Sequence, residues 1–111
     1  MSLVHLAAAL VIVSTGLVHS ILGQRRIMAR VGANEAIHPR IRRALGFTWH
    51  LAGLLMVVTG VTVGWPGTPA GLVGVIGAIY VALGMLSLWM TRGRHISGPM
   101  FTLGGLLALL A

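Results

Sequence analysis

The histidines carry the most versatile chemistry in this sequence. The chain has five histidines, one acidic residue and no cysteine, which excludes thiolate metal sites, cysteine nucleophiles and carboxylate pairs. Neutral imidazole binds Zn, Cu and haem iron. Three histidines lie near the ends of apolar runs, on the side where the arginines gather, so folding could bring them together. They are our candidate set for binding a transition metal (Zn or Cu) or haem: His19, His50 and His95.

The same histidines have other possible uses. As neutral side chains they can hydrogen-bond between helices, and the protein would then be a non-catalytic membrane subunit or a module that binds lipid or a partner. Because imidazole titrates near neutrality, they could also serve a small oligomeric proton-coupled carrier or channel. No Ser–His–acid set or phosphate loop is present, so the sequence gives no positive indication of an enzyme.

A transport role has one partial precedent. In size and number of spans the chain resembles the small multidrug-resistance transporters, whose activity depends on an acidic residue in the first span. Here the single acid, Glu35, lies outside the apolar runs. The resemblance therefore does not extend to the residue that would carry the activity.

The elements that must position the histidines are long apolar segments. Of 111 residues, 57% are hydrophobic and 8% charged, whereas soluble domains have about 25% charged residues. We predict an all-α integral membrane fold, a single domain of four transmembrane helices in an antiparallel bundle. Its spans are expected at about 3–22, 44–65, 70–90 and 96–111, with a basic loop at 23–43.

The arginines predict the orientation in the membrane. All eight basic residues are arginines, and they fall within 25–43 and 92–94. By the positive-inside rule these segments are cytoplasmic and both termini lie outside, in the inner (plasma) membrane. Trp49 and Trp89 would then mark the inner interface and Trp65 the outer one. This clustering also argues against nucleic acid as a partner.

The first basic segment is expected to touch lipid. Helix one can continue through Arg30, and Pro39 suits the first turn of the next helix. Apolar residues among the arginines favour a segment lying against anionic headgroups. The arginines expected to make these contacts are Arg25, Arg26, Arg30, Arg40, Arg42 and Arg43.

Small residues predict where helices meet. Glycines recur at spacings of three, four or seven residues within the spans, and such stripes allow helix backbones to approach closely. A spare small-residue stripe on the third span favours a homo-oligomer or a subunit of a membrane complex. The glycines assigned to helix packing are Gly53, Gly60, Gly64, Gly77, Gly84, Gly98 and Gly105.

Two further patterns bear on the packing. Segments 40–55 and 92–107 align without a gap, which permits two helical hairpins repeated in parallel. The hydroxyl of Tyr80, near the middle of the third span, needs a partner in an apolar setting, and we expect it to be Thr59 or Thr102.

Overall fold

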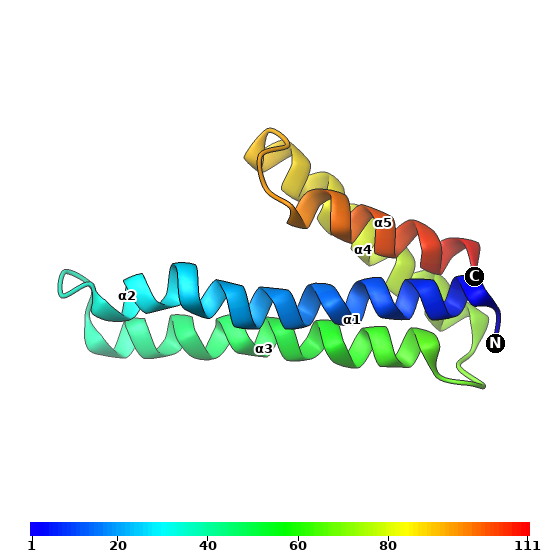
Figure 1. Cartoon of the computed structure of the whole chain (residues 1–111), viewed down its shortest axis with the longest axis horizontal. Helices are drawn as coiled ribbons and strands as arrows, with labels where there is room; N and C mark the ends of the chain where they lie inside the picture. Colours follow the sequence, from blue (N-terminus) through cyan, green and yellow to red (C-terminus); the bar gives the residue numbers. More distant parts are fainter.

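The chain is entirely helical, without a β-strand, in a computed structural model that describes residues 1–111. The first helix runs on through one π-helical turn, η1, into a short α-helical end, α2. Three more helices follow (Figure 1). The elements are α1 (Leu3–Gly23), η1 (Gln24–Met28), α2 (Ala29–Ala33), α3 (Pro39–Gly64), α4 (Ala70–Thr91) and α5 (Ser97–Leu110).

Three of the four main helices are long and apolar enough to cross a membrane. They are the continuous helix Leu3–Ala33 of 31 residues, α3 of 26 and α4 of 22. Helix α5 has 14 residues, or about 21 Å at 1.5 Å per residue, short of the ~30 Å of a bilayer core. The fourth predicted span is therefore a shorter apolar helix.

Most of the segment predicted as a basic loop is helical. The first helix continues to Ala33, and α3 begins at Pro39, in the position where proline needs no hydrogen-bond partner. The ring of His38 caps α3, because its Nδ1 accepts the Arg40 N–H at 3.2 Å. Only a short turn thus separates the two helices, and both reach well beyond the predicted membrane spans.

The helices form two hairpins. Helix α1 packs along α3, α4 packs along α5, and the hairpins meet mainly where α1 touches α5. Helices α3 and α4 make few contacts, one being a 2.7 Å hydrogen bond between Thr59 Oγ1 and the Tyr80 hydroxyl. Of the two partners expected for the Tyr80 hydroxyl, Thr59 and Thr102, it is Thr59 that binds it. The four helices therefore do not close evenly around one central core.

The core lies at one end of the molecule. It occupies the start of α1 and α4 and the end of α3 and α5, beside the chain termini. From there the hairpins diverge, so that their other ends stand apart (Figure 1). The core residues are Ala8, Ile12, Val63, Val73, Ile76, Tyr80 and Ala108.

Glycines line the contact within the first hairpin. A Cβ atom on Gly53 would overlap Ser20 of α1, and one on Gly60 would lie 2.7 Å from a methyl group of Val13. A Cβ atom on Gly64 would lie 2.8 Å from the Cβ atom of Ala9 in α1. Larger residues would force the helices apart, because such distances are far below a normal van der Waals contact.

The second hairpin is built in the same way. A Cβ atom on Gly77 would lie 2.9 Å from the Gly105 carbonyl oxygen, and one on Gly105 would lie 2.6 Å from that of Gly77. Added Cβ atoms would overlap Thr102 at Gly84 and lie 2.7 Å from a leucine of α4 at Gly98. Both hairpins therefore depend on close backbone approach.

Each hairpin contains an equivalent glycine–glycine contact. Gly53 and Gly105 occupy matching places in the two segments that align in the sequence. Each lies against a glycine of the preceding helix, Gly16 and Gly77 respectively. The aligned positions thus have the same packing role in both hairpins.

Large apolar side chains cover the outside. Only 17 of 111 residues are buried, and none of these is polar or charged. Exposed apolar residues occur on every long helix, among them Leu10, Phe47, Leu54, Val75 and Leu86. A surface of this kind is unusual for a protein in water and fits a membrane protein.

Candidate functional site

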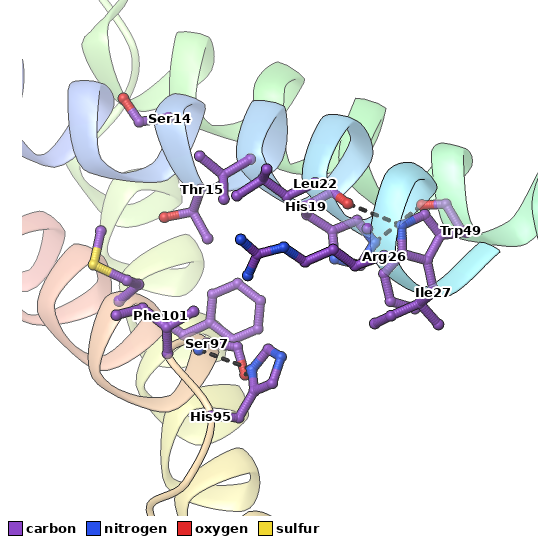
Figure 2. A pocket seen from close by; sticks show the side chains of 14 residues that line it. Ser14, Thr15, His19, Leu22, Arg26, Ile27, Trp49, His95, Ser97 and Phe101 are labelled. Carbon is purple, nitrogen blue, oxygen red and sulfur yellow. Dashed lines mark hydrogen bonds between the residues drawn. The ribbon is translucent and has the colours of Figure 1, made fainter. Parts of the chain in front are cut away.

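A cavity lies between the diverging ends of the two hairpins. Its volume is about 320 Å³. One wall is the C-terminal half of α1 together with η1. The other wall is the turn before α5 and the first residues of α5 (Figure 2). The cavity exists because the core joins the two hairpins only at the end of the molecule near the chain termini.

The α1 wall is mixed in character. Val18 and Leu22 supply apolar surface, while Thr15, His19 and Arg26 supply polar groups. The three polar residues follow one another at intervals of four and seven, which places them on one face of a helix. Facing them from the second hairpin are His95, Ser97, Met100 and Phe101.

His19 is held by Trp49 of α3. The two rings stack with centroids 4.2 Å apart and planes 11° from parallel. The indole N–H of Trp49 donates to the His19 carbonyl oxygen at 2.9 Å, and His19 Nε2 lies 3.1 Å from the Trp49 carbonyl oxygen. Since a carbonyl oxygen can only accept, Nε2 carries a proton and Nδ1 is the ring atom left for a ligand.

His95 begins the opposite wall. Its Nδ1 accepts the backbone N–H of Ser97 at 3.1 Å and lies 2.8 Å from the Ser97 hydroxyl. The Ser97 hydroxyl is in turn 2.6 Å from that of Ser87 on α4. Because Nδ1 accepts, the proton of the neutral ring is on Nε2, which stays free to donate.

His50 lies elsewhere. It sits on the exposed side of α3, in a shallow depression with Phe47 and Leu54, and its Nε2 is 2.9 Å from Gln24 Oε1. The structure thus brings His19 and His95 to one cavity and leaves His50 outside it. No three histidine or acidic side chains are placed to hold one metal ion, so ligation of a metal or haem stays a prediction.

Arg26 reaches into the cavity from η1. Its side chain runs back along α1, and the guanidinium group lies between the α1 wall and Phe101 (Figure 2). This direction follows from helix geometry, since side chains lean toward the N-terminus of their helix. Arg26 was predicted only as one of the arginines that contact lipid, although its spacing of seven residues from His19 could have shown that it shares that face.

The π-helical turn was also missed. In η1 the Ala29 N–H donates to the Gln24 carbonyl, five residues earlier instead of four. Such turns are rare and often occur at functional sites. The sequence Gln24–Met28 has no glycine or proline that would have signalled it.

The other basic residues lie outside the cavity. Arg25, Arg30, Arg40 and Arg43 are exposed, as Arg26 also is, and Arg42 donates a 2.7 Å hydrogen bond to the Gly32 carbonyl. The last bond ties the start of α3 to the end of the first helix. The contacts of these arginines with lipid headgroups stay a prediction.

Comparison of the chain with known protein families, curated proteins and solved structures finds no match. A functional proposal for this protein therefore rests on the chemistry of the cavity and on the placement of the helices.

Proposed function

We propose that this is a multi-pass protein of the inner (plasma) membrane that binds a membrane amphiphile in the cavity between its two hairpins. The three long helices cross the bilayer in alternating directions, and the shorter α5 returns from the cytoplasmic face toward the outer one. The arginine-bearing ends are then in the cytoplasm and both termini outside. The observation that carries the proposal is the cavity itself, which has apolar walls, a few polar groups, and a position at the basic end of the molecule.

The membrane setting is supported by four features. Three helices have the required length and hydropathy, and large apolar side chains are exposed along them. All arginines lie at the ends where the hairpins diverge, as the positive-inside rule requires. Trp65 and Trp89, 67% and 77% exposed, suit the two interfaces.

The choice of ligand is supported by the size and lining of the cavity. Small-molecule sites have volumes of roughly 300–1,000 Å³ and are mostly apolar with a few polar groups. This cavity, at about 320 Å³, lies at the lower end of that range. Val18, Leu22 and Phe101 would contact an acyl or alkyl chain, and the polar groups would face its head.

The test uses Trp49, which lines the cavity. In a variant with Trp65→Phe and Trp89→Phe, Trp49 is the only tryptophan. The protein is placed in phosphatidylcholine nanodiscs and titrated with a brominated dodecanol, whose bromine quenches tryptophan on contact. We expect quenching that saturates.

A pair of matched variants controls for ligand that merely dissolves in the bilayer. Val18→Phe narrows the cavity, whereas Val58→Phe makes the same change on the outer face of α3, and the two valines are similarly exposed at 47% and 50%. We expect Val18→Phe to weaken binding about tenfold, as the loss of a few apolar contacts would. Quenching that does not saturate, or that is equal in both variants, would refute the proposal.

Ligation of a transition metal or haem is the second candidate. The observation in its favour is that His19 and His95 approach the same cavity from separate hairpins. Elemental analysis and the absorbance spectrum of the purified protein test it. Bound metal or haem should be lost on His95→Ala and kept on His50→Ala, and a colourless, metal-free protein would exclude this candidate.

A further inference from the structure

We infer that the ligand of the cavity carries a single anionic head group, a carboxylate or a phosphate monoester, which Arg26 and His95 bind from opposite walls. This inference rests on the proposed function and names the class of amphiphile. It follows from the charge of the cavity, from the free donors on both walls and from the direction of the Arg26 side chain.

The titratable side chains that line the cavity are all basic. Its lining includes one arginine and two histidines and no acidic residue. Glu35, the one acid of the chain, lies in the turn between the first helix and α3. Nothing in the lining therefore neutralises the guanidinium group, and an anionic group is the complementary ligand.

Arg26 presents unused donors. A guanidinium group has five N–H donors in a planar fork that matches a carboxylate or phosphate. The Arg26 side chain makes no hydrogen bond within the protein, and Arg42 is the one arginine whose side chain does, to the Gly32 carbonyl. Arg26 also points along the apolar part of α1 (Figure 2), although arginines near a membrane surface usually extend toward water.

His95 supplies a second donor from the other hairpin. Its Nδ1 accepts from the Ser97 backbone, which orients the ring. While Nδ1 accepts this bond the ring is neutral, and its one N–H is on Nε2, which can donate it. An anionic head between Arg26 and His95 would thus be bound by both hairpins, with its chain running toward Val18 and Phe101.

The experiment uses four ligands with the same chain: dodecanoate, dodecyl phosphate, dodecanol and dodecylammonium. Each competes with the brominated dodecanol in the Trp49 quenching assay, at alkaline pH so that the carboxylate is ionised. We expect the two anions to bind at least about tenfold more tightly than dodecanol, as charge-assisted hydrogen bonds would give. Dodecylammonium should bind more weakly than dodecanol.

The matched pair Arg26→Gln and Arg25→Gln locates the effect. Both variants remove one positive charge at the same membrane surface, but only Arg26 lines the cavity. Arg26→Gln should remove most of the advantage of the anions over dodecanol, leaving the part that His95 contributes, while Arg25→Gln should keep the whole advantage. Arg26→Lys, which retains the charge without the fork, should keep part of it.

The outcomes separate the two proposals and the two sources of an anion. Dodecanol that binds saturably while the anions bind no better overturns this inference alone, as does an equal effect of Arg25→Gln and Arg26→Gln. If no ligand binds saturably, the proposed function fails as well. Acetate and inorganic phosphate should not displace the probe, and displacement by them would show a site for free anions instead of amphiphiles.

Discussion

His19 and Trp49 hold α1 and α3 together by three contacts at once. Each side chain hydrogen-bonds to the carbonyl oxygen of the other residue, at 2.9 Å and 3.1 Å, and the two rings stack at 4.2 Å. The pair forms part of the cavity wall. It also restricts His19 to one tautomer, which leaves Nδ1 as the ring atom without a partner in the protein.

Trp49→Phe should weaken this pair without removing it. A phenyl ring can still stack on His19, but the indole N–H donor is lost. Hydrogen bonds between helices in membranes contribute about 0.6 kcal/mol on average and up to about 1.7 kcal/mol, so we expect a loss of about 1 kcal/mol in the free energy of unfolding. Reversible unfolding in lipid–SDS mixed micelles measures it.

Trp49→Ala provides the comparison for that prediction. It removes the stack as well as the donor and leaves a void, so it should cost more, about 2–3 kcal/mol for a side chain that is only partly buried. Equal stability of the two variants would show that the hydrogen bond, and not the ring, accounts for the whole contribution of Trp49.

Gly23→Ala should displace Trp49. A Cβ atom on Gly23 would overlap the indole ring, whereas one on Gly32 would meet nothing within 4 Å. We therefore expect Gly23→Ala to lower stability by about 1–3 kcal/mol, as overpacking does, and to shift the Trp49 emission. Gly32→Ala, the matched control in the same continuous helix, should be neutral or stabilising by up to about 1 kcal/mol.

Gly105→Ala should disrupt the second hairpin. The new methyl group would lie 2.6 Å from the Gly77 carbonyl oxygen and from the Val81 backbone nitrogen. A loss of about 1–3 kcal/mol in the free energy of unfolding is expected. Gly74→Ala on α4 is the control, because nothing lies within 4 Å of that position. A similar loss in both variants would argue against close packing as the cause.

The orientation can be tested with reporters that are active on one side of the membrane only. A reporter fused after Ala111 should be active outside the cytoplasm, and one inserted in the turn at Asn34–His38 should be active inside. The physical reason is the cost of moving the flanking arginines across the bilayer. The reverse pattern would contradict the proposed topology, and the turn at 65–69 serves as a second external site.

Much of the fold could be predicted from local sequence. Long apolar runs predicted the long helices, and Pro39 predicted where one of them begins. The glycine stripes identified residues that lie at helix contacts. These features depend on neighbouring residues alone, so no tertiary information was required for them.

The fate of His50 shows why the candidate site was only partly predicted. In the sequence Gly46, His50, Gly53 and Gly60 fall on one stripe of α3, but the contact with α1 is made by Trp49, Gly53 and Gly60. At about 100° per residue, Trp49 and His50 lie on opposite sides of Gly53, about 40° and 60° away. Either stripe fits the sequence, and only the packing partner selects one.

The sequence by itself determined that this chain forms long apolar helices with all their arginines at one end. The tertiary structure decided that the helices pair into two hairpins joined at the other end, leaving a cavity that His19, His95 and Arg26 share. The physical reason is that the length of a helix and the position of its charges depend only on residues that are close together in the sequence. The rotation of each helix and the angle between hairpins depend on contacts between distant residues, such as Gly77 with Gly105.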